Sequence, residues 1–325
     1  MTGTETGGTA GGSMGGDPED PLGRRLGALV REWPDLAEAA EVYRVTLPLL
    51  RNVRPIAAPI PLTADQARRT LAEGRYLLHG VALVFDHGGA RELMLGLARN
   101  LEASGRVAVS PIRSALEGDR LDLVELLGRV SEGDYPSVAA RAEAQALDPP
   151  LLWTLAQSAL KPTLRAWCGE LAPLVLAAGV WEKACCFICG ATAALGELQG
   201  NEQSRHLRCG QCGADWLTRR LQCIYCGHED ASLLGVLSPE GRRENVRVDV
   251  CDKCHGYLKV VTRFAPGSPE ELAVEDLSTL TWTASRRSEA TGVRCNGGMT
   301  GTNNGSIARR RWSISRSVPG RAGPP

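Results

Sequence analysis

Apolar residues recur at helical spacing through the first half of the chain. Leu160, Leu164, Trp167, Leu171 and Leu174 step by four, three, four and three, which places them in one stripe on a helix. Two shorter sets show related spacing: Leu151, Leu152, Leu155 and Ala159, and Leu121, Val124, Leu127 and Val130. Prolines divide the pattern into about seven segments, and no long alternating strand pattern occurs. These features predict an all-α domain over residues 18–180.

The predicted helical domain carries no recognisable catalytic set. Asp148 before Pro149-Pro150 has the composition of a helix N-cap. Asp86 and His87 could form an acid–base pair, but the following Gly88-Gly89 favours a turn with a solvated histidine, and its spacing does not match a phosphate-binding loop. Cys168 lies beside the longest apolar stripe and is predicted to be a small buried residue.

The second half of the chain contains most of the cysteines. Nine of the eleven fall between Cys185 and Cys254, and eight of them form four Cys-x-x-Cys pairs. The pairs are Cys186/Cys189, Cys209/Cys212, Cys223/Cys226 and Cys251/Cys254. Two intervening residues allow one tight turn to direct both sulfur atoms at one point, and tetrahedral metal sites need four such ligands. The pairs therefore predict two four-cysteine metal sites, one in a module over residues 181–222 and one over residues 223–264.

Other uses of these cysteines fit the sequence less well. Disulfides within four such pairs would be unusual in a reducing cytosol, and a thioredoxin-type redox centre needs one pair only. Cys185 breaks the two-residue spacing and Cys295 has no partner pair, so neither is assigned to a site. His206, His228 and His255 lie near the pairs, but each site already has four sulfur ligands, which favours surface or outer roles for the imidazoles.

Charge and composition narrow the function further. The chain has no basic and apolar export signal and no apolar run of about 20 residues, which favours a cytoplasmic protein without a membrane span. Residues 183–264 contain eleven Lys or Arg and nine Asp or Glu, a weak basic balance for a nucleic-acid module. Because all four ligand positions of each site would be filled, the sites lack the open position of catalytic zinc. A protein-binding or regulatory role is favoured over an enzyme.

The cysteine pairs and the residues between them resemble the formate dehydrogenase accessory proteins of the FdhE type. The similarity is carried by Arg208-Cys209-x-x-Cys212-x-x-x-Trp216-x-x-Arg219, by Cys223-x-x-Cys226-Gly227, and by Val250-Cys251-x-x-Cys254-x-Gly256-Tyr257-Leu258-Lys259. It continues upstream through Leu147-Asp148-Pro149 and Ala159-Leu160-Lys161-Pro162. Members of the family commonly have proline after the first cysteine of the first pair, where this chain has Phe187.

The resemblance implies a fold and a role that spacing alone does not. It implies a helical domain followed by two tandem rubredoxin-like, zinc-ribbon-like modules, with two metal ions per chain. The ions would be iron, with zinc as the alternative, held by the eight paired cysteines. It also implies a non-enzymatic cytoplasmic helper that binds the catalytic subunit of a molybdenum-containing formate dehydrogenase before export. Nothing in the sequence defines the oligomeric state.

The two ends of the chain differ from the rest. Residues 1–17 form a Gly-rich leader that is expected to be disordered, and residues 265–284 are expected to form a short helix or linker. Residues 285–325 contain eight arginines and one acid, and are predicted to be a disordered basic tail. One interpretation of this tail is a frameshift, since GC-rich codons can be chosen for Thr281 to Val293 that encode a family-like ending in another frame. The other is a genuine basic segment that contacts RNA or an acidic partner.

Two alternative functions remain open from the sequence. A metal-ribbon protein could bind nucleic acid through Arg242, Arg243, Arg247 and the basic tail, and such binding would weaken steeply with salt. A thiol-dependent redox enzyme is the weaker alternative, because full metal occupancy of all eight cysteines would exclude it.

Overall fold

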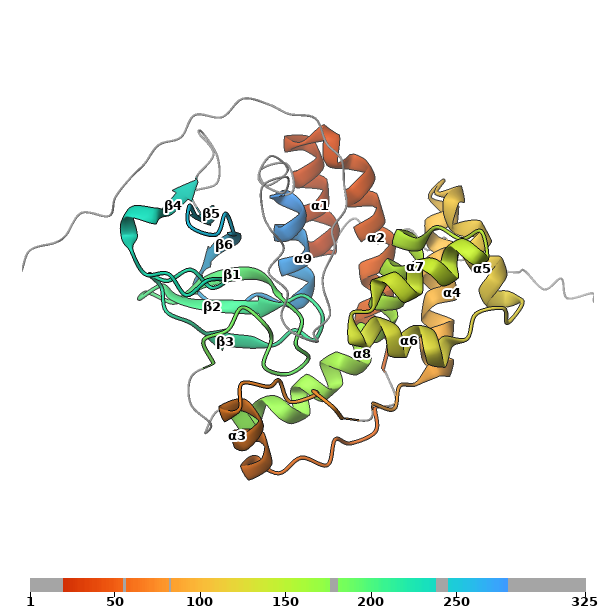
Figure 1. Cartoon of the computed structure of the whole chain (residues 1–325). Coiled ribbons are helices and arrows are strands. Elements are labelled where there is room, and N and C mark those ends of the chain that lie inside the picture. The colour runs from red at the N-terminus through yellow and green to blue at the C-terminus, as the bar shows by residue number, and fades with distance from the viewer. Residues whose placement is uncertain (1–19, 55–56, 82, 176–180, 238–244, 280–325) are drawn as a thin grey trace, which may run out of the picture.

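The computed structural model describes residues 20–54, 57–81, 83–175, 181–237 and 245–279. Helices fill the first half of this part, and one mixed sheet fills the second (Figure 1). The longer helices are α1 (Pro21–Glu32), α2 (Ala37–Asn52), α3 (Ala64–Ala72), α4 (His87–Ala103), α5 (Ser110–Glu117), α6 (Leu123–Glu132), α7 (Tyr135–Ala144) and α8 (Pro149–Val175). Three-residue 3-10 turns precede α2 at Pro34–Leu36 and α5 at Val107–Val109. The predicted helical region is thus confirmed.

The longest helix follows the predicted stripe closely. The backbone N–H of Leu151 donates to the Asp148 carboxylate at 2.8 Å, so the predicted cap of α8 is present. Leu160, Leu164, Trp167 and Leu171 are buried along one face. The two stripes that the sequence suggested as neighbours belong to this single helix, which continues through Pro162 and Pro173.

Asp86 caps a helix, and the predicted apolar stripe in α6 is only partly buried. Asp86 is a helix cap, since its carboxylate accepts a hydrogen bond from the backbone N–H of Gly89 at 2.9 Å at the start of α4. The expected stripe in α6 is wrong at one position. Leu127 and Val130 are buried, but Val124 is 62 % exposed because it lies on the outer face of the helix.

The cysteine-rich half folds into one six-stranded sheet. Its strands are β1 (Ala193–Gln199), β2 (Ser204–Cys209), β3 (Asp215–Leu217), β4 (Leu234–Leu237), β5 (Val246–Cys251) and β6 (Tyr257–Arg263), in the order β3-β2-β1-β6-β5-β4. Neighbours are antiparallel except β1 and β6, which pair in parallel from Gly196 with Val260 to Gln199 with Arg263. A 3-10 turn, Ala231–Leu233, precedes β4. The two modules, expected as successive units, therefore share one sheet.

The strand order reveals an internal repeat. Each module runs turn, strand, strand, turn, strand, with a cysteine pair in each turn, and contributes three adjacent strands to the sheet. The parallel β1–β6 pair joins the first strand of one repeat to the last strand of the other. Strand β3 and strand β4 are consequently the two edges of the sheet.

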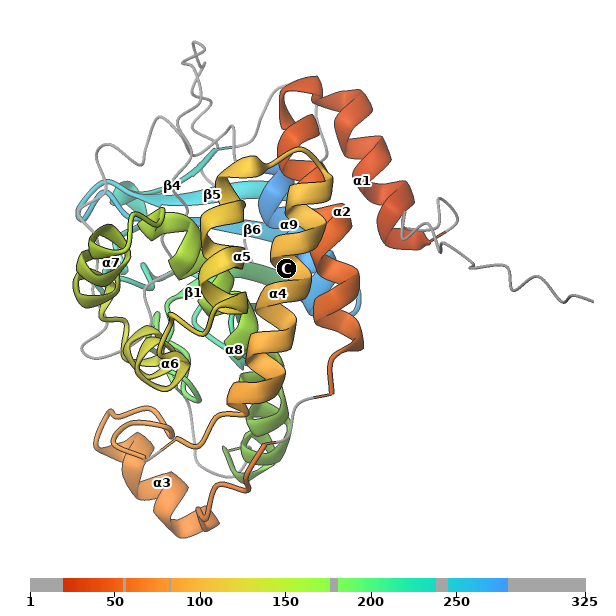
Figure 2. The same cartoon turned by 90° about the vertical axis from the view of Figure 1, so that its right-hand side faces the viewer.

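Helix α9 (Pro269–Ser278) returns the chain to the helical half. It begins with a capping box in which the Ser268 hydroxyl accepts from the Glu271 N–H and the Glu271 carboxylate accepts from the Ser268 N–H. Leu272 packs on the sheet with Leu195 and Val261, and α9 contacts α1 and α2 on its other side (Figure 2). Helix α9 lies within residues 265–284, where a short helix or linker was expected, whereas the leader 1–17 and the tail 285–325 lie outside the described residues.

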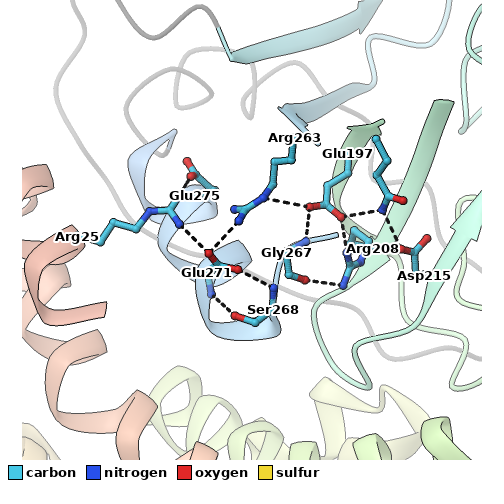
Figure 3. A network of polar contacts seen from close by, with 10 residues as sticks. Arg25, Glu197, Arg208, Asp215, Arg263, Gly267, Ser268, Glu271 and Glu275 are labelled. Atoms are coloured by element: carbon cyan, nitrogen blue, oxygen red, sulfur yellow. Dashed lines mark hydrogen bonds and ion pairs between the residues drawn. The ribbon is translucent and has the colours of Figure 1, made fainter. Parts of the chain in front are cut away.

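An ionic network with a buried centre connects these parts (Figure 3). Glu197 of β1 is fully buried, pairs with Arg208 of β2, and accepts a hydrogen bond from the Gly267 N–H at 2.9 Å. Arg263 lies 3.9 Å from Glu197 and 2.8 Å from Glu271. On the opposite side of α9, Arg25 of α1 pairs with Glu271 at 3.3 Å and with Glu275. Charges on the sheet, α9 and α1 are thereby neutralised in one continuous set.

Candidate metal centres

Four cysteines from the first module form one compact group, the first centre. Cys186 and Cys189 lie in the turn before β1, Cys209 ends β2, and Cys212 lies in the turn before β3. Each turn is closed by backbone hydrogen bonds, from the Gly190 N–H to the Cys186 carbonyl at 2.9 Å and from the Gly213 N–H to the Cys209 carbonyl at 3.1 Å. The Sγ atoms of Cys186 and Cys212 are 3.5 Å apart, as are those of Cys189 and Cys209.

The second module repeats this arrangement as the second centre. Cys223 and Cys226 lie before β4, Cys251 ends β5, and Cys254 lies before β6. The Gly227 N–H donates to the Cys223 carbonyl at 2.9 Å. The Sγ distances are 3.6 Å between Cys223 and Cys254 and 3.8 Å between Cys226 and Cys251. All eight cysteines predicted as ligands thus gather in two groups of four, in the pairing that the sequence spacing indicated.

The sulfur spacing fits a tetrahedral metal ion. With metal–sulfur bonds of about 2.3 Å, a regular tetrahedron has edges of about 3.8 Å between sulfur atoms. The four distances given above lie between 3.5 and 3.8 Å. A disulfide would need about 2.05 Å between sulfur atoms, so these contacts are not disulfides. The cysteines could hold two ions, and Zn²⁺ and iron both accept this geometry.

Without a bound ion, the pKa values of the four thiols in the first centre shift in different directions. Burial raises the pKa of Cys186 and of Cys212, whereas hydrogen bonds from the neighbouring thiols lower the pKa of Cys209. A set of four buried thiols therefore cannot ionise independently. A divalent ion would stabilise all four thiolates together, and its binding would release protons.

A fifth cysteine adjoins the first centre. The Cys168 side chain, half-buried on α8, packs against the core that contains Cys212, and the nearby Cys212 thiol lowers the pKa of Cys168. Burial lowers the pKa of Lys161, which lies two helical turns before Cys168, and the negative charge of a Cys209 thiolate would oppose this shift. From the sequence, Cys168 was predicted to be only a small buried residue. Cys168 and Lys161 are seven residues apart and therefore lie on the same side of α8. This spacing is the signal that could have placed Cys168 on the side of the helix that faces the first centre.

The remaining sequence candidates lie outside the two groups. His206 bonds to the Asp215 carboxylate at 2.5 Å, and His228 lies 3.4 Å from the Lys253 ammonium. His255 is exposed. Cys185 pairs through its backbone with Thr192, next to the first turn. Cys295, like Arg242 and Arg243, falls outside the described residues.

Glycines in equivalent turns differ in their surroundings and allow a direct test. Gly190 and Gly227 both have positive φ, of 76° and 70°. A Cβ on Gly190 would lie 2.7 Å from the Tyr76 ring, whereas a Cβ on Gly227 would meet nothing within 4 Å. Both alanine variants incur the left-handed backbone cost of about 1–2 kcal/mol. Gly190→Ala should lose about 1–3 kcal/mol more from overpacking.

The measurement for this glycine pair is urea unfolding of the two variants and the parent protein under identical conditions. A midpoint for Gly190→Ala clearly below that of Gly227→Ala is expected. Equal midpoints would mean that the Tyr76 ring does not confine the first turn.

The fold and these centres define a class of protein: a helical domain joined to a repeated four-cysteine module, with both repeats on one sheet. No family model matches the chain. The chain is similar to a protein named FdhE homolog from Aquifex aeolicus, at 34 % identity over 104 residues that cover 31 % of this chain and 35 % of the relative. A protein with the same name from Edwardsiella ictaluri is 26 % identical over 197 residues, or 58 % of each chain.

A solved structure extends the similarity to the fold. The crystal structure of the FdhE protein from Pseudomonas aeruginosa matches with a TM-score of 0.54 and 23 % identity, over 85 % of this chain and 93 % of that one. The curated relatives in Aquifex aeolicus and Shewanella baltica are matched over about a third of their length, at 35 % and 33 %. The resemblance to the FdhE family that the cysteine motifs indicated is confirmed.

In the described part of the chain, no helix has the length and apolar character needed to cross a membrane.

Proposed function

We propose that this protein is a non-enzymatic accessory factor in the maturation of a molybdenum-containing formate dehydrogenase. In this proposal it binds the catalytic subunit in the cytoplasm before export. The similarity to FdhE homologues supports the proposal, because the cysteine motifs and the fold agree with the same family. The observation that carries it is the pair of four-cysteine centres on a helical scaffold like that of the FdhE crystal structure.

The centres would serve this role by fixing a surface. Cys186, Cys189, Cys209 and Cys212 would hold one ion, and Cys223, Cys226, Cys251 and Cys254 a second. Each bound ion would crosslink two cysteine turns, which hydrogen bonds alone hold only weakly. Since every ligand position would be filled by cysteine, substrate would have no place at either ion, which supports a helper without catalysis. We propose rubredoxin-like iron at both centres, with zinc as the alternative.

The organisation into units belongs to the same proposal. Residues 18–180 would form the helical domain, and residues 181–222 and 223–264 the two metal modules. The partner would contact a surface that depends on these modules being closed.

The described arginines give less support to the nucleic-acid alternative. Arg247, which the sequence offered as a contact, lies 2.9 Å from the Asp249 carboxylate, and Arg205 lies 3.8 Å from the same group. A carboxylate shared by two guanidinium groups reduces the local positive charge that would attract phosphate.

Deleting the gene in the source organism tests the proposed role. Formate-dependent dye reduction by cell fractions should fall by at least tenfold, while the amount of the catalytic polypeptide stays within twofold. A plasmid copy of the gene should restore the activity. Unchanged dye reduction in the deletion strain would refute the role in formate dehydrogenase maturation.

A further inference from the structure

The two centres have the same ligands and nearly the same sulfur spacing, but very different cover. The cysteines of the first centre are 0, 3, 4 and 2 % exposed, in the order Cys186, Cys189, Cys209 and Cys212. In the second centre Cys223 and Cys251 are buried, Cys254 is half-buried and Cys226 is exposed. The repeat therefore places one centre inside the molecule and the other at its surface.

The helical domain covers the first centre. Backbone N–H groups of Leu77 and Leu78 donate to the carbonyls of Phe187 and Ile188 at 2.8 and 3.0 Å, which ties the first cysteine turn to the segment after α3. Phe187 and Ile188 are themselves buried, and Cys168 of α8 adjoins Cys212. All four cysteines of this centre belong to the same apolar core as the buried residues of α4 and α8.

Partners within its own module cover one side of the second centre. Tyr225 lies against Gly256, and its hydroxyl donates to the Tyr257 carbonyl at 3.0 Å, so one side is shielded. The equivalents of the buried Phe187 and Ile188 are Ile224 and Tyr225, which are half-buried. Gly227, Asp252, Lys253 and His255 in the two cysteine turns are exposed. None of the four cysteines belongs to either apolar cluster of the described residues.

Exposure of a thiolate controls how fast it reacts and how fast its metal leaves. An incoming thiol or chelator must approach the ion or displace a sulfur ligand, and a buried centre permits this only after local unfolding. We propose that the second centre exchanges its ion with thiol or chelating ligands in solution, whereas the first centre retains its ion for as long as the protein stays folded. The site of exchange is the exposed edge formed by Cys226 and Cys254.

This inference rests on the metal binding in the proposed function, but it concerns which centre responds. Protein loaded with two zinc ions is mixed with an excess of the chromophoric chelator 4-(2-pyridylazo)resorcinol, and release is followed by absorbance. Two phases of about one ion each are expected, with the first at least tenfold faster. Cys226→Ser should remove the fast phase. Cys189→Ser, the matched change in the first centre, should remove the slow phase.

Alkylation of the unmodified, metal-loaded protein provides a second readout that needs no variant to fold. Brief treatment with iodoacetamide, followed by peptide mass mapping, should label Cys226 and Cys254 before any cysteine of the first centre. A single release phase for both ions, or labelling of Cys186 or Cys209 as early as Cys226, would overturn the inference. Protein that binds no metal would refute the metal proposal instead, and the labelling order would still decide whether the second centre is the accessible one.

Discussion

Replacing Cys209 by alanine is expected to remove one metal ion and to lower the melting temperature of the whole protein by 10 °C or more. Structural zinc contributes apparent free energies of ~10–16 kcal/mol in small fingers, and a lost ligand forfeits much of this. The sulfur atom of Cys209 lies in the core that the helices share with the first centre, so opening the centre exposes helical residues as well. Elemental analysis and calorimetry of the purified variant provide the two measurements.

Cys251→Ala is the matched control for this change. Cys251 ends β5 as Cys209 ends β2, and it belongs to a group of four in the same way. Its centre lies outside both apolar clusters of the described residues. The variant should therefore also lose one ion, but its melting temperature should fall much less than that of Cys209→Ala. Two ions and an unchanged melting temperature in Cys209→Ala would contradict the assignment of that residue as a ligand.

Glu197→Ala is expected to lower the free energy of unfolding by about 3–5 kcal/mol, the cost of removing one partner from a buried ion pair. Arg208 is 6 % exposed, and its guanidinium would then retain the Gly267 carbonyl at 3.0 Å and the Asp215 carboxylate at 3.5 Å. Gly267 would also lose the acceptor of its N–H at the start of α9. Chemical denaturation with circular dichroism measures the loss.

The double variant Glu197→Leu with Arg208→Met shows whether the loss of stability in Glu197→Ala comes from the remaining charge of Arg208 or from lost packing. Removing both charges should recover a substantial part of the loss, because apolar replacement of a buried ion pair is often neutral. Glu202→Ala, on an exposed residue between β1 and β2, should have a negligible effect. A loss in Glu197→Ala no larger than that in Glu202→Ala would show that the network does not stabilise the fold.

Much of the candidate site could be predicted from local spacing. Two residues between cysteines define a tight turn, and the distance between pairs is what an intervening hairpin requires, so the two groups of four follow from the sequence. The cap at Asp148 and the buried face of α8 follow in the same way from short-range rules. Such features depend on residues that are close in the chain.

Long-range pairing could not be predicted in the same way. The parallel contact of β1 with β6 joins segments about 60 residues apart, and no local pattern specifies it. The packing of Cys168 against the core around the first centre and the pairing of Arg25 with Glu271 depend equally on how the helical half packs on the sheet. The difference in exposure between the centres arises from this packing, although their sequence motifs are nearly the same.

Capture of the partner tests the proposed accessory role most directly. The full chain, tagged and isolated with its metal from the cytosol of the source organism, should co-purify with the formate dehydrogenase catalytic subunit as an enriched protein in mass spectrometry. A tagged cytosolic protein of similar size should not enrich that subunit. Capture is expected to fall at least fivefold in Cys209→Ala, because the surface that the centres hold would be lost. Absence of the catalytic subunit from the intact protein's capture, in cells that contain the enzyme, would contradict the proposed accessory role.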